Sequence, residues 1–220
     1  MTSEISKRPV TALLAALAAA AATATLISGC APLLLGGALI GGSLVVTDRR
    51  SSGTQVEDQA IELKGLKRVG DTIGDRGSVS VTSYNRVVLL TGTVLAEPDK
   101  AAVARAIGAI DNVKSVVDEV AIGPAASLGN RSNDTLLTSK VKASMVDAKD
   151  VQAHSYKVVT ERGVVYLMGR VTEREATRAA DITRGVSGVQ KVVKVFEIVS
   201  EAELAELQPK PASDPATGKP

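Results

Sequence analysis

The clearest hydrophobic pattern in this chain occurs twice. Residues 87–94 and 164–171 are apolar runs dominated by Val and Leu, and each contains a glycine near its end, Gly92 or Gly169. Runs of this length that are rich in β-branched residues are typical of β-strands. The two glycines lie 77 residues apart. A repeat of this length indicates a duplicated domain rather than the short unit of a solenoid.

Each copy predicts the order helix, strand, strand, helix, strand. Thr172 followed by Glu175 is a capping box, in which each side chain satisfies a free backbone N–H of the other residue at the start of a helix. Ser132 or Asn133 can cap an earlier helix. The elements expected in the second copy are a helix over 134–146, strands over 155–160 and 164–171, a helix ending at Arg184 and a strand over 189–199.

These elements predict an α+β fold with two tandem αββαβ domains. In each domain the first two strands form an antiparallel hairpin, and the last two are parallel because a helix joins them. The result is a mixed three-stranded sheet packed on two helices. We expect a first domain over 56–123, a linker over 124–132, a second domain over 133–200, and a disordered tail over 201–220 that opens with a weak helical pattern.

The N-terminus has the pattern of a secretory signal. Lys7 and Arg8 precede an uncharged stretch over 10–27, and small residues stand directly before Cys30. This resembles the bacterial lipobox, in which the cysteine is lipidated and becomes the new N-terminus. A transmembrane helix with an incidental cysteine is the alternative. We therefore expect residues 1–29 to be a signal peptide.

Lipidation of Cys30 predicts a membrane-anchored protein, since several acyl chains give stable anchoring. The next residue is Ala31 and not the Asp that commonly retains bacterial lipoproteins at the inner membrane. This indicates the outer membrane, with the protein facing the periplasm. Residues 30–55 are then the lipidated cysteine followed by an apolar, flexible tether.

Composition narrows the function classes. The chain has 26 Lys and Arg against 24 Asp and Glu, a balance that argues against a nucleic-acid-binding protein. It has one Cys and one His, which exclude an internal disulfide, a multi-cysteine metal site and a two-histidine zinc motif. No nucleophile–base pair stands out, so we expect no enzyme, no cofactor and no metal. The aromatic residues are expected in cores or between the domains: Tyr84, Tyr156, Tyr166 and Phe196.

The predicted helix over 134–146 has two apolar sides. One side is its core stripe, made of Leu137, Val141, Ser144 and Met145. The other side is an apolar strip with basic margins, which suits a membrane interface or packing on the other domain. The strip and its margins, taken together as candidate lipid-binding residues, are Leu136, Ser139, Lys140, Lys142, Ala143 and Val146.

The duplicated pattern resembles the BON-domain family, and in particular its outer-membrane lipoproteins with two BON domains. The resemblance rests on residues 53–58, 132–135, 171–176 and 186–189. It implies the αββαβ fold and binding of anionic, phosphatidylglycerol-like phospholipid through the second domain. It also implies a role in outer-membrane integrity, enrichment at division sites and contact with the β-barrel assembly machinery.

One position departs from the family pattern. Where such lipoproteins typically have Trp, this chain has Leu136. Leucine enters hydrocarbon well but lacks the interfacial anchoring of an indole. Two functions are therefore kept open: a lipid-binding module, and a protein-interaction scaffold at the outer membrane, for example with the β-barrel assembly machinery.

Overall fold

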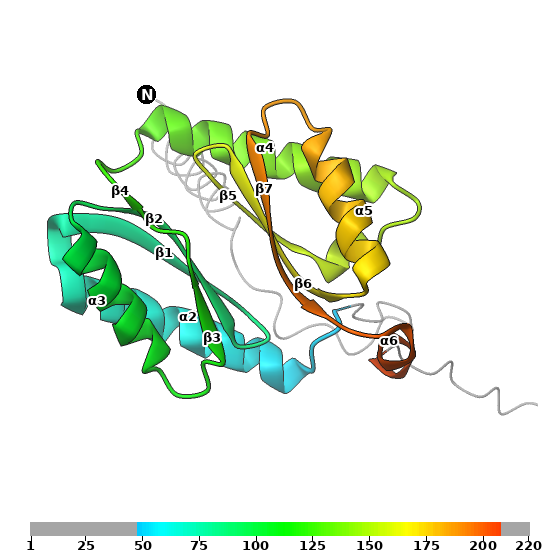
Figure 1. Cartoon of the computed structure of the whole chain (residues 1–220), viewed down its shortest axis with the longest axis horizontal. Coiled ribbons are helices and arrows are strands. Elements are labelled where there is room, and N and C mark those ends of the chain that lie inside the picture. The colour runs from blue at the N-terminus through cyan, green and yellow to red at the C-terminus, as the bar shows by residue number, and fades with distance from the viewer. Residues whose placement is uncertain (1–47, 208–220) are drawn as a thin grey trace, which may run out of the picture. The chain divides into compact units, whose positions relative to one another are not determined.

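The computed structural model describes residues 48–207 (Figure 1). The predicted signal peptide, Cys30 and most of the expected tether lie outside the described residues, as do residues 208–220.

The first domain is an α+β unit of the predicted order. The antiparallel hairpin of β1 and β2 is joined through α3 to a strand that runs parallel to β2. That third strand is interrupted, so that β3 and β4 both pair with β2 and the sheet counts four strands. The elements are α2 (Ser52–Ile73), η2 (Gly74–Arg76), β1 (Gly77–Tyr84), β2 (Val87–Val94), α3 (Glu97–Gly108), β3 (Ser115–Asp118) and β4 (Ala121–Ile122).

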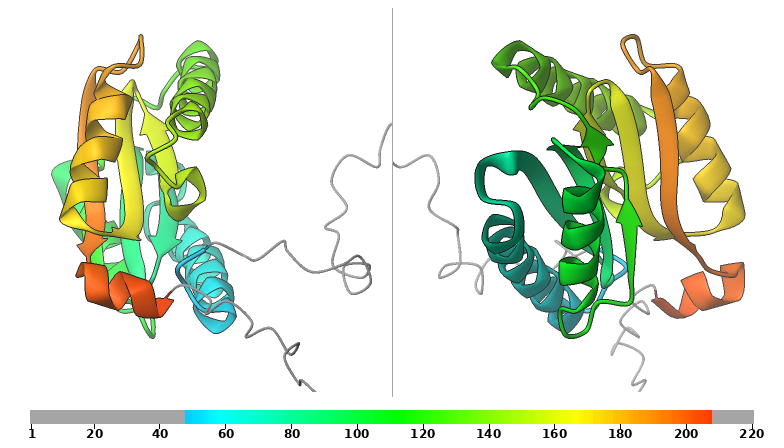
Figure 2. Two further views of the ribbon diagram at one scale, coloured as in Figure 1. Left: turned by 90° about the vertical axis from the view of Figure 1, so that its right-hand side faces the viewer. Right: turned by 60° about the vertical axis from the view of Figure 1, so that its left-hand side comes forward.

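The second domain repeats this topology with an uninterrupted third strand. The sheet order is β5-β6-β7, antiparallel and then parallel, as expected. Figure 2 shows β6 and β7 side by side, with α5 along them. The elements are α4 (Leu128–Asp147), η3 (Ala153–Ser155), β5 (Lys157–Glu161), β6 (Val164–Val171), α5 (Glu173–Arg184), β7 (Lys191–Ile198) and α6 (Glu201–Leu207).

Successive side chains of each strand enter different cores because they point to opposite faces. On β2, Leu90 packs with the helices of the first domain, whereas Leu89 joins a third cluster. That cluster combines Leu89 and Tyr84 with Tyr166 and Met168 of the second domain. Each sheet therefore has its own helices on one face and the other sheet on the opposite face. The prediction that the tyrosines lie in cores or between the domains is confirmed.

The repeated glycines mark close backbone approaches. A Cβ atom on Gly92, which has φ +112°, would lie 2.1 Å from the carbonyl oxygen of Ser78. A Cβ atom on Gly169 would lie 2.6 Å from the carbonyl oxygen of Ser155. Both contacts are too short for a side chain, so the same strand position requires glycine in each copy.

Three helices extend into segments that were expected to be linker, tether or tail. Helix α4 begins at Leu128, inside the expected linker, because the Ser127 side chain accepts a hydrogen bond from the Asn130 N–H and caps the helix there. Helix α2 begins at Ser52, inside the expected tether, and is capped by Ser51. The expected disordered tail begins with helix α6, in agreement with its weak helical pattern.

Candidate functional site

Helix α4 presents different chemistry on each of its sides. Leu137, Val141 and Met145 are buried in the core of the second domain, which confirms three positions of the predicted core stripe. Ser144, the fourth, is half-buried.

The opposite side of α4 is exposed. Leu136 is 62% exposed and Val146 is 70% exposed. Ser139, Lys140, Lys142 and Ala143 are exposed as well, so the six candidate residues share one accessible surface. Leu128, 81% exposed, adds an apolar residue in the first turn of the same helix. It was missed because the helix was expected to begin at residue 134. We call the side chains of Leu128, Leu136, Ser139, Ala143 and Val146 the α4 strip.

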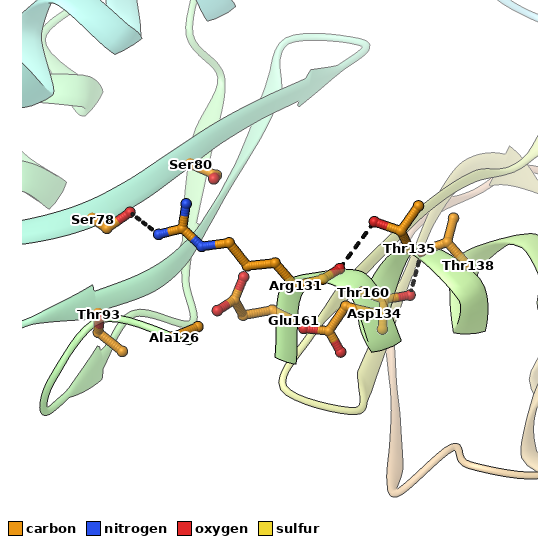
Figure 3. Close-up of a pocket in the computed structure, with 10 residues that line it drawn as sticks. All are labelled: Ser78, Ser80, Thr93, Ala126, Arg131, Asp134, Thr135, Thr138, Thr160 and Glu161. Carbon is orange, nitrogen blue, oxygen red and sulfur yellow. Dashed lines mark hydrogen bonds between the residues drawn. The ribbon is translucent and has the colours of Figure 1, made fainter. Parts of the chain in front are cut away.

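The first domain contacts a different side of α4. Arg131 donates a hydrogen bond to the hydroxyl of Ser78 on β1, at 3.4 Å (Figure 3). The two residues line a polar groove of about 240 Å³ that is rich in hydroxyl groups, among them those of Thr135 and Thr160. The alternative that the α4 strip packs on the first domain is therefore wrong, because that domain meets the Arg131 side.

One aspartate of α4 fixes the neighbouring hairpin. Asp134 accepts hydrogen bonds from the N–H groups of Arg162 and Gly163, at 2.8 and 2.9 Å. These residues form the tight turn between β5 and β6, where Arg162 has φ +51°. The aspartate therefore holds the turn against the helix.

The first domain uses the same device. Asp58, which lies 76 residues before Asp134, accepts from the N–H groups of Asn85 and Arg86 and from the hydroxyl of Ser83. Burial opposes its ionisation, but the hydrogen bonds from Ser83 and the turn outweigh burial and hold the pKa of Asp58 below its usual value.

Two arginines in the expected tether were missed as structural residues. Arg49 is only 6% exposed, and its guanidinium contacts Glu175, the capping-box residue of the second domain. Arg50 forms an ion pair with Asp58 of the first domain at 2.8 Å, and its guanidinium lies 4.2 Å from the centre of the Tyr84 ring. Adjacent residues thus hold the start of the described chain to both domains. The only sequence signal was a pair of arginines just before a helix.

The carboxylate of Glu161, beside α4, lies in surroundings that disfavour its charged form. Burial, reinforced by the nearby charge of Asp134, raises the pKa of Glu161 above its usual value. Glu161 lines the polar groove with Arg131 (Figure 3).

Neither a membrane span nor a metal centre is found in the part of the chain that the structure describes. None of the helices there has both the length and the apolar character that crossing a bilayer requires. Across residues 48–207, His, Cys, Asp and Glu side chains also form no group of three or more that could hold a metal ion.

Comparison with known proteins shows to which family the chain belongs. The BON domain model matches residues 58–124 and again 133–200. The outer membrane lipoprotein DolP of Haemophilus influenzae is 36% identical over 173 residues, covering 78% of this chain and 89% of that protein. A 21 kDa hemolysin of Actinobacillus pleuropneumoniae is 30% identical, and the match covers 69% of this chain and 79% of that protein. The osmotically-inducible protein Y of Escherichia coli is 28% identical, and the match covers 69% of this chain and 77% of that protein. The duplicated sequence, the duplicated αββαβ fold and these matches show that the chain belongs to the BON-domain family and carries the domain twice.

Proposed function

We propose that this protein is an outer-membrane lipoprotein, anchored through Cys30, whose second BON domain binds anionic phospholipid on the periplasmic side and supports the integrity of the membrane. The observation that carries the proposal is the exposure of the α4 strip, whose Leu136 and Val146 are 62% and 70% exposed. The similarity to a relative named as an outer membrane lipoprotein supports the location.

The chemistry of the α4 strip suits an interface. Its apolar side chains can enter the boundary between headgroups and acyl chains, while Lys140 and Lys142 at its margins remain at the level of the phosphates. Each basic residue near an anionic surface contributes about 1 kcal/mol of attraction. The second domain, residues 133–200, has eleven basic and eight acidic residues, whereas residues 56–123 have eight and ten. The charge balance therefore favours the second domain as the one that meets an anionic membrane.

The proposal is tested by vesicle flotation of residues 46–220, which contain every core and ion pair described above and lack the lipidated cysteine. We expect the fragment to float with phosphatidylglycerol-rich vesicles but not with phosphatidylcholine vesicles, and to do so less at high salt because screening weakens the attraction. Leu136→Glu is expected to weaken binding more than about tenfold, since it puts a charge in place of an apolar side chain that enters the membrane in the proposed complex.

Leu63→Glu is the matched control. Leu63 is 73% exposed on α2, so this variant adds the same charge to an exposed leucine of the other domain. It is expected to bind like the unmodified fragment. Equal losses in the two variants, or no flotation of a fragment that unfolds cooperatively, would exclude the lipid-binding function. The scaffold function would then stand, with the α4 strip as the surface to test against the β-barrel assembly machinery.

Two further parts of the proposal concern the cell. Cys30→Ser is expected to move the protein from the membrane fraction to the soluble periplasmic fraction. A fluorescent fusion of the lipidated protein is expected to concentrate at division sites, and Leu136→Glu is expected to weaken that concentration if phospholipid binding directs it. A fusion spread evenly around the cell would contradict the division-site role.

A further inference from the structure

A groove of about 530 Å³ lies beside the α4 strip. Its walls come from the N-terminal half of α4, from the turn at residues 162–163 and from the loop that precedes β7. Leu136 belongs both to this groove and to the α4 strip, so the two surfaces are continuous. The groove differs from the one between the domains, which lies on the Arg131 side of the helix, although Asp134 lines both.

Two cations line this groove, Lys140 and Arg162. None of the ion pairs found within residues 48–207 includes either side chain. The carboxylate in its lining is Asp134, whose two oxygens each accept a backbone N–H from the turn. Because Asp134 is engaged by the backbone of the turn, the positive charges of Lys140 and Arg162 remain available to an anion in the groove.

The position of Arg162 is set in advance of binding. Its backbone lies in the left-handed region, at φ +51°, and Asp134 holds both N–H groups of the turn. A cation on a turn fixed in this way loses less freedom on binding than one on a flexible loop. A guanidinium can also donate two parallel hydrogen bonds to one phosphate group.

The first domain lacks the same combination. The residue 77 positions before Arg162 is Asn85, whose amide donates to Glu197 and is buried. The residue 76 positions before Leu136 is Ala60. The chain therefore contains a near copy of this region without the apolar residue and without the free arginine.

We propose that this groove holds the phosphate-bearing headgroup of an anionic phospholipid, with Arg162 and Lys140 contacting the phosphate while the acyl chains lie along Leu136 and the rest of the α4 strip. The inference rests on the proposed function and adds the site that distinguishes anionic from neutral lipid. The amides of Asn133 and Gln190, which also line the groove, can exchange hydrogen bonds with headgroup hydroxyls.

The test compares three single variants of the 46–220 fragment in the flotation assay. Arg162→Asn introduces the residue found in the first domain, and asparagine tolerates the left-handed backbone of the turn. Lys140→Gln removes the second cation. Lys149→Gln removes an exposed lysine that lies outside the groove, and so controls for net charge. We expect Arg162→Asn and Lys140→Gln each to weaken binding to phosphatidylglycerol vesicles about fivefold or more, and Lys149→Gln less than about twofold.

A second measurement separates a headgroup site from diffuse attraction. In ¹H–¹⁵N spectra, addition of a short-chain phosphatidylglycerol is expected to shift the backbone amides of Gly163 and Gly188 saturably. In Arg162→Asn the same shifts are expected to need a lipid concentration about fivefold higher or more to saturate. Equal losses in all three variants, with no saturable shift, would mean that only general surface charge acts, and would overturn the headgroup site. The proposed function would survive that result if Leu136→Glu still abolished binding.

The same spectra distinguish lipid from a free anion. Inorganic phosphate and sn-glycerol 3-phosphate are expected to shift these amides only weakly, because neither can contact Leu136. Shifts from free phosphate that saturate at the same concentration as those from the short-chain lipid would overturn the lipid assignment in favour of a soluble phosphate site.

Discussion

Arg49 donates hydrogen bonds to both carboxylate oxygens of Glu175, at 2.7 and 2.8 Å, across 126 residues of sequence. Glu175 also accepts from the Thr172 N–H and so completes the capping box of α5. The pair is almost fully buried, with 7% of Glu175 exposed. The residue that leads out of the expected tether is therefore held by the second domain, which carries the α4 strip.

We predict that Arg49→Gln lowers the free energy of unfolding by about 3–5 kcal/mol, since it leaves a buried carboxylate without its counterion. Urea unfolding of the 46–220 fragment measures this change. Glu175→Gln is expected to cost less when combined with Arg49→Gln than alone, because the double variant removes both charges and glutamine still suits the capping box. Arg174→Gln is the control: its contact with Glu201 is long, at 3.6 Å, and exposed. A loss below about 1 kcal/mol for Arg49→Gln would contradict the role given to the pair.

Substitution by alanine is predicted to have different effects at Gly92 and at Gly70. Gly92→Ala is expected to destabilise the first domain by about 2 kcal/mol or more, because the new Cβ would clash with the Ser78 carbonyl at a backbone angle that suits glycine. Gly70→Ala is expected to be neutral or to stabilise by up to about 1 kcal/mol. Gly70 lies in α2, where a Cβ would meet nothing within 4 Å. Denaturation midpoints of the two variants check the contrast, and similar midpoints would contradict it.

Asp58 and Glu175 predict loss of stability in acid. Burial disfavours both carboxylates, yet hydrogen bonds from Ser83 and the turn lower the pKa of Asp58, and those from Arg49 lower the pKa of Glu175. A lowered folded-state pKa stabilises the fold fully above the unfolded value of about 4, and the stabilisation is lost as the pH falls through the folded-state pKa.

Unfolding free energies measured from neutral pH downwards test this. We expect little change until the pH approaches about 4 and a steep fall below it. In Asp58→Asn the stability is expected to be lower at neutral pH and its fall in acid shallower. An acid fall as steep as that of the unmodified fragment would show that Asp58 does not contribute.

The raised pKa of Glu161 predicts the opposite effect of pH on stability. Burial and then the charge of Asp134 raise its pKa, so its ionised form opposes folding at pH 7. Glu161→Gln is therefore expected to raise the unfolding free energy at neutral pH. The gain should shrink as the pH falls through the raised folded-state pKa, and it should vanish below the unfolded value of about 4.3. Glu206→Gln, an exposed change in α6, is the control and is expected to leave stability unchanged at neutral and at acidic pH.

Leu136→Trp tests the departure from the family pattern. At 62% exposure the side chain has room to be enlarged without disturbing the core. An indole anchors at the level of the headgroups, so the variant is expected to bind phosphatidylglycerol-rich vesicles more tightly than the unmodified fragment in the same flotation assay. Unchanged binding would show that this position does not reach the interface.

Local patterns in the sequence were enough to predict the duplicated αββαβ fold. The apolar runs of β2 and β6, the capping box at Thr172 and the core stripe of α4 each depend on residues within about two helical turns of one another. The same periodicity separated Leu136 from Leu137 and so identified the strip. The start of α4 did not follow from the sequence, because several serines and asparagines near residue 130 could act as the cap.

Tertiary structure decided which of these surfaces remain free. Whether the α4 strip would pack on the first domain depended on how the two sheets stack, which is determined by side chains far apart in sequence such as Leu89 and Tyr166. The Arg49–Glu175 pair and the groove between Lys140 and Arg162 likewise join separate segments. Which residues are apolar, basic or helix-capping follows from the sequence, because those properties are local. Their partners depend on long-range packing, and only the folded chain brings those partners together.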